Sequence, residues 1–134
     1  MIKRYSRKEL TDIWSEENKY KIWLEVEIAA AQAMEKLGQI PKGVSSIVKR
    51  KAKINVNRIH AIEAKVKHDV IAFLTSVTEK VGINARYLHQ GMTSSDVLDT
   101  SFNIQLVQSG KILLKDIDLI LKILRRQAKK YKFT

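Results

Sequence analysis

The stretch DVLDTSFNIQLVQSGKILLKDIDLILKIL, residues 96–124, decides the fold of this chain. Its apolar residues recur at spacings of three and four, which is the pattern of one face of an α-helix. Only Gly110 interrupts the pattern, and a helix tolerates an internal glycine at a cost of about 1 kcal/mol. The spacing therefore predicts one long helix, or two nearly collinear ones.

A helix of this length needs something to cover it. At about 1.5 Å per residue it runs on the order of 50 Å, which is too long for a domain of this size to bury. We expect the helix to have a partner, either more chain or other subunits. The end of the stretch is cationic, which favours the helix dipole. After Asp118 there is no acidic residue, and the basic residues are Lys122, Arg125, Arg126, Lys129, Lys130 and Lys132.

The chain before residue 96 is also helical in its pattern, and no segment alternates with a period of two. Ser6 and Glu9 predict a capping box for a short first helix. Ser15 predicts the cap of a longer helix that ends at Gly38. We expect its buried stripe to be Ile22, Trp23, Val26, Ala30, Ala33, Met34 and Leu37.

Three further helical segments precede the loop at residues 83–95. They are expected around residues 44–48, from about residue 57 to 66, and over residues 70–81, with Asp69 as the cap of the last and Gly82 as its end. The fold class is therefore all-α. We expect an N-terminal helical domain at residues 1–110 and the first long helix of a helical-bundle domain at residues 111–134.

The composition excludes several classes of protein. The 134 residues hold 25 Lys and Arg, 14 Asp and Glu and no Cys, for a formal net charge of +11. Without Cys there is no disulfide framework, thiolate zinc site or thiol nucleophile. The first residues lack the apolar centre of a secretory signal, and no window holds the roughly 18 apolar residues of a membrane span. We expect a cytoplasmic protein with no membrane partner, whose charge attracts anions.

Metal and nucleotide motifs are weak or missing. The three histidines, at positions 60, 68 and 89, lack the spacing of a helical zinc site, so no metal site is expected. There is also no P-loop, no GxGxxG and no GxSxG.

Three polar clusters lie at breaks between helices, where free backbone N–H groups bind anions. They are Arg4–Tyr5, Lys67–Asp69 and Thr93–Asp96, the last preceded by His89. Each also has a plainer interpretation: a solvated arm, a capped kink with a surface histidine, and an ordinary helix cap. Composition and spacing alone leave both interpretations open for each cluster.

The segments that carry these clusters resemble adenylosuccinate lyases, within the fumarase and aspartase superfamily. The matching strings are HQGMTSSDVLDT at residues 89–100, KHDVIAFL at 67–74, WLEVEIAAAQAMEKLGQIP at 23–41 and Arg4-Tyr5-Ser6. The resemblance implies an all-α enzyme without a cofactor. Its activity would be elimination of fumarate from adenylosuccinate, giving AMP, and from the succinylcarboxamide ribonucleotide on the route to IMP. It also implies a homotetramer whose long helices form a common bundle, with active sites assembled from several subunits.

The resemblance also implies roles for the residues of the three clusters. Arg4 and Tyr5 would contact the nucleotide phosphate, and Lys67, His68 and Asp69 would line the substrate pocket. Thr93 and Ser94 would hold an anionic group such as a succinyl carboxylate, and His89 and Ser95 would support the pocket. His68 would either protonate the departing amine or position the substrate.

The main acid and base segments of that family, a second histidine segment and a serine-bearing loop, find no counterpart in these residues. We therefore expect this chain to be the N-terminal part of the enzyme and to be inactive alone. Fumarate release by the chain above the uncatalysed rate would contradict that expectation.

Two alternatives come from other classes of protein: a small basic helical module that binds nucleic acid, and a helical oligomerisation module. Under the enzyme hypothesis no nucleic acid partner is expected.

Overall fold

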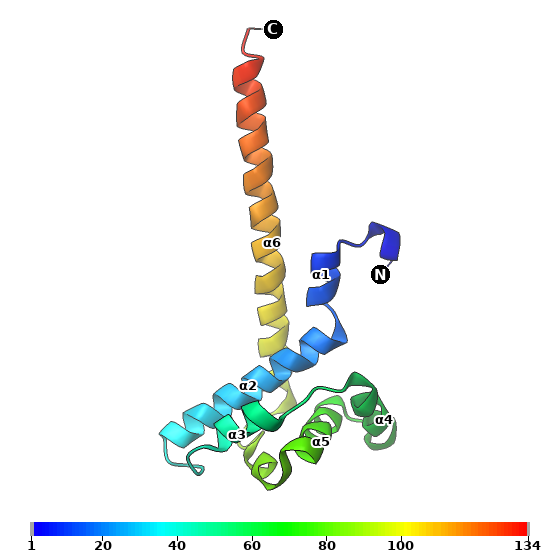
Figure 1. The fold of residues 1–134 in the computed structure, drawn as a ribbon, viewed down its shortest axis with the longest axis vertical. Coiled ribbons are helices and arrows are strands. Elements are labelled where there is room, and N and C mark those ends of the chain that lie inside the picture. The colour runs from blue at the N-terminus through cyan, green and yellow to red at the C-terminus, as the bar shows by residue number, and fades with distance from the viewer. Residues whose placement is uncertain (1, 134) are drawn as a thin grey trace.

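The computed structural model describes residues 2–133, which form helices and connecting loops without a strand. The six α-helices are α1 (Lys8–Ile13), α2 (Glu16–Lys36), α3 (Val44–Lys51), α4 (Val56–Val66), α5 (Asp69–Val81) and α6 (Ser94–Lys130), with 3₁₀ turns at Lys3–Tyr5 and Gly82–Tyr87. Helices α2 to α5 form a head, and α6 rises from it as a long straight shaft (Figure 1). The predicted all-α fold class is confirmed.

Helix α2 begins and ends where its sequence signals predict. The Ser15 side chain accepts a hydrogen bond from the backbone N–H of Asn18 at 3.2 Å, which satisfies one of the free donors of the first turn. At the other end Leu37 is the C-cap, and Gly38 follows with φ of 71°, a left-handed conformation that glycine adopts without strain.

The capping box predicted from Ser6 and Glu9 is wrong. Helix α1 has Arg7 at its N-cap position and no side-chain cap. The Ser6 hydroxyl instead donates to the carbonyl of Ile2 at 2.8 Å, so it closes the turn before the helix.

The predicted buried stripe of α2 is partly wrong as well. The buried residues of the helix are Tyr20, Ile22, Trp23, Glu27 and Ala31, whereas Ala33 is exposed and Leu37 is 72% exposed. The buried stripe contacts Phe73 of α5 and His89 of the loop before α6. It includes the charged side chain of Glu27, which an apolar pattern does not reveal.

The centre of the core is a cluster of three aromatic rings from α2 and α5. The Trp23 ring meets the Phe73 ring edge-on, with centroids 5.4 Å apart, and Tyr20 stacks on Phe73 at 6.0 Å. All three side chains are almost completely buried. Aromatic pairs in such geometries stabilise a core beyond the area that they bury.

Helix α6 is one continuous helix of 37 residues, with two halves that differ in burial. Its first half packs on α2 and α1, and its buried residues are Val97, Ser101, Gln105 and Ser109. Beyond Ser109 none of its residues is buried. The large apolar side chains exposed there are Leu113, Leu114, Ile117, Leu119, Ile120, Leu121, Ile123 and Leu124. Among residues 2–133 the helices lack the combination of length and hydrophobicity that a membrane-spanning helix needs.

The corner between α1 and α2 docks on the middle of α6. The Gln105 side chain donates to the carbonyl of Ile13 at 2.8 Å, and the ring of Trp14 lies 5.8 Å from that of Phe102. Arg7 forms an ion pair with Asp116, about three helical turns beyond Gln105. These contacts fix where the N-terminal arm lies.

Candidate functional site

The loop before α6 brings the third polar cluster to the base of the long helix. Thr93 is the N-cap of α6, and the Asp96 carboxylate accepts a hydrogen bond from the Thr93 backbone N–H at 2.8 Å. Within the described residues the hydroxyls of Ser94 and Ser95 make no hydrogen bond. The start of α6 therefore offers free hydroxyl donors at the positive end of the helix dipole, an arrangement that suits an anion.

The same loop is attached to the core through Glu27. This residue of α2 has an exposed fraction of 0%, and its carboxylate accepts from the backbone N–H of His89 at 2.7 Å. Its other oxygen lies 2.7 Å from His89 Nδ1. His89 has φ of 59°, a left-handed conformation that a residue with a side chain holds only when its contacts fix it. The two bonds to Glu27 supply that constraint.

The second cluster forms the tight junction between α4 and α5. Lys67 ends α4 in a left-handed conformation with φ of 56°, and His68 is the N-cap of α5. The prediction that Asp69 caps α5 is wrong, because Asp69 is the first residue of the helix and its carboxylate accepts from the N–H of Val70 at 2.7 Å. The cap is His68, whose Nδ1 accepts from the N–H of Ile71 at 3.4 Å.

This cap has a chemical consequence for His68. A ring nitrogen that accepts a hydrogen bond carries no proton, so a neutral His68 has its proton on Nε2. The side chain is about half exposed, so this N–H is available to a ligand. The backbone of α5 thus holds neutral His68 as a hydrogen-bond donor through Nε2.

Lys67 and Asp69 lie on opposite sides of this junction, Lys67 at the end of α4 and Asp69 at the start of α5. Lys67 lines an open hollow of about 430 Å³ together with His60, Glu63 and Ala64 of α4. The Asp69 carboxylate lies 3.6 Å from His68 Nδ1, on the α5 side of the junction.

The buried phenol of Tyr20 is sensitive to the negative charges around this junction, so its pKa can be used to test them. Burial raises the pKa of its phenol to about 12, and the negative charges of Glu16, Glu63 and Asp69 add to the effect. Because the pKa is raised in the folded chain, Tyr20 contributes stability that is complete below about pH 10 and is lost between pH 10 and 12. We expect the ultraviolet tyrosinate titration of the chain to contain a phase near pH 12 that Tyr20→Phe removes. A titration curve that the substitution leaves unchanged at high pH would contradict this.

The first cluster lies apart from the other two. Arg4 and Tyr5 belong to the 3₁₀ turn Lys3–Tyr5, with the Arg4 guanidinium 4.8 Å from the centre of the exposed Tyr5 ring. This arm lies beside the shaft of α6, well above the head (Figure 1). Within residues 2–133 no hydrogen bond or ion pair joins one cluster to another.

The sequence also contained a residue of this site that pattern analysis missed. Glu27 lies four residues after Trp23 and four before Ala31, so it occupies the buried stripe of α2. An acidic residue at such a position is a signal for a buried polar contact, because buried charges are almost always paired. No group of three or more His, Cys, Asp or Glu side chains within the described part of the chain is arranged to hold a metal ion.

Comparison with known proteins links these segments to lyases. A family model described as Lyase matches residues 3–134. Over all 134 residues the chain is 46% identical to the adenylosuccinate lyases of Thermotoga maritima and Streptococcus mutans, and it spans 31% of the length of each. The resemblance inferred from the motifs is thereby confirmed.

Two solved structures share the fold. A fumarate lyase from Mesorhizobium sp. BNC1 superimposes with a TM-score of 0.84 at 22% identity, over 94% of this chain and 31% of that one. The β-carboxy-cis,cis-muconate cycloisomerase of Acinetobacter calcoaceticus sp. ADP1 gives a TM-score of 0.85 at 26% identity, over 95% of this chain and 32% of that one. The head and shaft are therefore an arrangement that these enzymes also contain.

Proposed function

Because the chain belongs to the lyase family, we propose that it forms the N-terminal part of an adenylosuccinate lyase. The activity would be elimination of fumarate from adenylosuccinate to give AMP, and from the succinylcarboxamide ribonucleotide of purine biosynthesis. The observation that carries this proposal is 46% identity over the whole chain to two enzymes of that name. A cytoplasmic location and the absence of a cofactor belong to the same proposal.

The proposed roles of the site residues follow from their local chemistry. Such an elimination needs a base at the carbon and an acid at the leaving nitrogen. His68, whose side chain is about half exposed, would in its imidazolium form donate a proton to the departing amine and return to neutral imidazole, with Lys67 and Asp69 lining the pocket beside it. The acid and base segments that complete the reaction would come from other parts of the assembled enzyme.

The anionic groups of the substrate would be held at two places, the N-terminus of α6 and the N-terminal arm beside the same helix. Thr93 and Ser94 would bind a succinyl carboxylate at the helix N-terminus, supported by His89 and Ser95. Arg4 and Tyr5, on the N-terminal arm, would bind the nucleotide phosphate. Because that arm lies apart from the other clusters, it would serve a site in which another subunit supplies the remaining residues.

A chimeric enzyme tests this proposal. This chain would replace the matching segment of the Thermotoga maritima enzyme, and fumarate release from adenylosuccinate would be measured. We expect activity within about tenfold of the parent, because 46% identity preserves the head and the motifs. Arg4→Ala in the chimera should raise KM for the nucleotide, since a bidentate phosphate contact is lost.

Lys8→Ala is the matched control, because Lys8 is an exposed cation of the same arm whose ion-pair partner is Asp12 of its own helix. A chimera that assembles correctly but releases no fumarate would overturn the proposed function.

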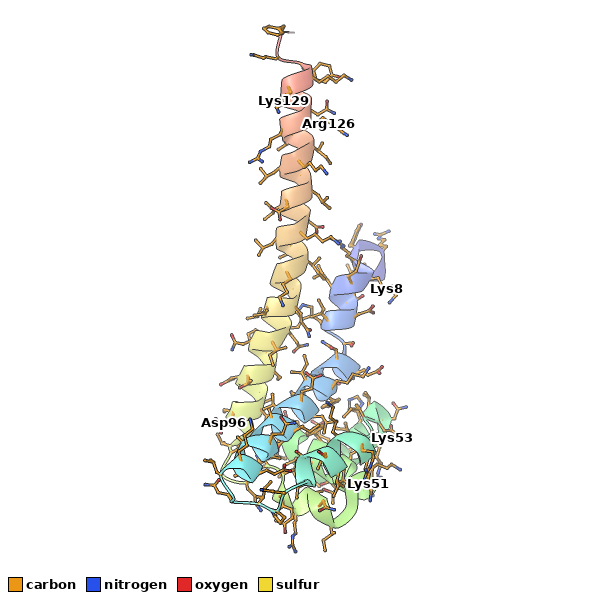
Figure 2. The ribbon with its side chains drawn as sticks, turned by 60° about the vertical axis from the view of Figure 1, so that its left-hand side comes forward. Lys8, Lys51, Lys53, Asp96, Arg126 and Lys129 are labelled. Carbon is orange, nitrogen blue, oxygen red and sulfur yellow. The ribbon has the colours of Figure 1, made fainter. Side chains whose placement is uncertain are left out.

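A homotetramer built on α6 is part of the proposal, with a domain boundary near residue 110. The last buried residue of α6 is Ser109, and most of the exposed large apolar side chains of the helix lie beyond it. The shaft also carries cations at its far end, where Arg126 and Lys129 project, while Asp96 lies at its base (Figure 2). An apolar helix face of this length is typical of a surface that other helices cover.

Substitutions on this face give a measurable prediction. Leu114, Ile117 and Leu121 share one side of α6 and are 64%, 51% and 44% exposed. We expect the chain to self-associate in sedimentation velocity experiments, and replacing the three residues by lysine should weaken that association at least tenfold.

The control is Leu37→Lys at the far end of α2, which is more exposed than any of the three yet lies off the shaft. Association that survives the triple substitution would exclude this face as the interface.

A further inference from the structure

Glu27 is the one charged side chain of the described chain that is completely buried. Neither Lys nor Arg pairs with it among residues 2–133, and both of its oxygens serve His89. One oxygen of Glu27 holds the backbone of the loop at His89, and the other contacts the His89 ring itself.

The geometry determines which ring nitrogen of His89 carries a proton. An ionised carboxylate only accepts hydrogen bonds, so with Glu27 ionised the 2.7 Å contact between its carboxylate and Nδ1 places a proton on Nδ1. A neutral His89 then has an unprotonated Nε2. This tautomer is the opposite of the one that the helix cap imposes on His68.

The other nitrogen of His89 reaches the surface. No hydrogen bond to Nε2 occurs within residues 2–133. The buried polar side-chain atoms of the described residues that lack a partner are Trp23 Nε1 and Ser109 Oγ, so Nε2 is not enclosed. The His89 side chain is 17% exposed, which leaves a ring edge open beside the loop that leads to Thr93.

We propose that Glu27 is a positioning residue, which fixes His89 in the Nδ1–H tautomer and presents Nε2 as a hydrogen-bond acceptor for a hydroxyl or amino group of the substrate. The statement that Nε2 accepts a hydrogen bond from the substrate rests on the proposed function. The buried carboxylate acts through His89 and does not itself reach the ligand. A carboxylate that orients an imidazole and selects its tautomer is a general device in enzyme sites.

Nuclear magnetic resonance of the ¹⁵N-labelled chain tests the tautomer directly. Two-bond ¹H–¹⁵N correlations at pH 8 distinguish the two tautomers, and a His89→Gln variant identifies the signals of this residue. We expect Nδ1–H in the wild type. In Glu27→Gln the amide oxygen can still accept from the backbone N–H of His89, but the amide nitrogen donates to Nδ1, so His89 should change to the Nε2–H tautomer.

Glu25→Gln is the matched control, since Glu25 is an exposed residue of the same helix two positions earlier, and it should leave the tautomer unchanged. Nε2–H in the wild type, or an unchanged tautomer in a folded Glu27→Gln variant, would overturn the proposal. If Glu27→Gln does not fold, the wild-type spectrum alone decides.

The chimeric enzyme separates this inference from the proposed function. There Glu27→Gln should lower kcat/KM by about 10–100-fold, as loss of an orienting partner typically does, while Glu25→Gln should leave it unchanged. Full activity of Glu27→Gln would reject the positioning role. An inactive chimera whose His89 still shows the Nδ1–H tautomer would count against the proposed function and for the orienting contact.

Discussion

Replacing Phe73 by alanine is expected to lower the free energy of unfolding by about 3–5 kcal/mol. The ring is completely buried between α2 and α5, where it stacks on Tyr20 and meets Trp23 edge-on. Its removal takes away the burial of a large apolar side chain and leaves a cavity that two rigid rings cannot fill. Urea unfolding followed by tryptophan fluorescence, at one fixed protein concentration, measures the change.

Ile71→Ala is the control for this prediction. Ile71 lies two residues earlier on the same helix, but it is 44% exposed and faces away from the aromatic cluster. Its truncation should change the stability by less than about 1 kcal/mol. If the two variants lose equal stability, the aromatic cluster is not the centre of the core.

Replacing His68 by asparagine is expected to lower kcat of the chimeric enzyme by about 10²–10⁴-fold, the usual contribution of a general acid. Asparagine is a favourable N-cap, so this variant keeps the cap of α5 and removes only the group that transfers a proton. Steady-state kinetics with adenylosuccinate measure the effect. KM should change little if His68 acts as an acid in the transition state.

The pattern of the two kinetic constants separates the two proposed roles of His68. A rise in KM with kcat unchanged would show that the residue only positions the substrate. Arg58→Gln is the control, because Arg58 is an exposed residue of α4 whose ion-pair partner is Glu79 and which does not line the hollow at Lys67. Its replacement should leave both constants close to those of the parent chimera.

The fold was largely predictable from local signals. The period of the apolar residues predicts α6, and Ser15, Gly38 and Gly82 mark helix ends that the structure confirms. The capping box predicted from Ser6 was wrong because its hydroxyl donates instead to a competing acceptor in the preceding turn, the carbonyl of Ile2. Propensity rules for caps do not contain that alternative.

The site was less predictable, because its contacts join residues far apart in the chain. The spacing of Trp23, Glu27 and Ala31 marks a buried acid, but the identity of its partner, 62 residues away, depends on how α2 packs against the loop before α6. The cap of α5 likewise depended on whether the helix begins before or after Asp69, a difference of one residue that local patterns do not resolve.

The continuity of α6 couples the geometry of the loop to the geometry of the shaft. Thr93 and Ser94 stand at one end of a rigid rod whose exposed apolar face is at the other. An α-helix turns by about 100° per residue, so inserting one residue near Gly110 would rotate the hydroxyls by about that angle relative to whatever covers the upper half. The number of residues between these two regions therefore fixes their relative orientation about the helix axis. An insertion that changes no residue of either region would still point the hydroxyls in another direction.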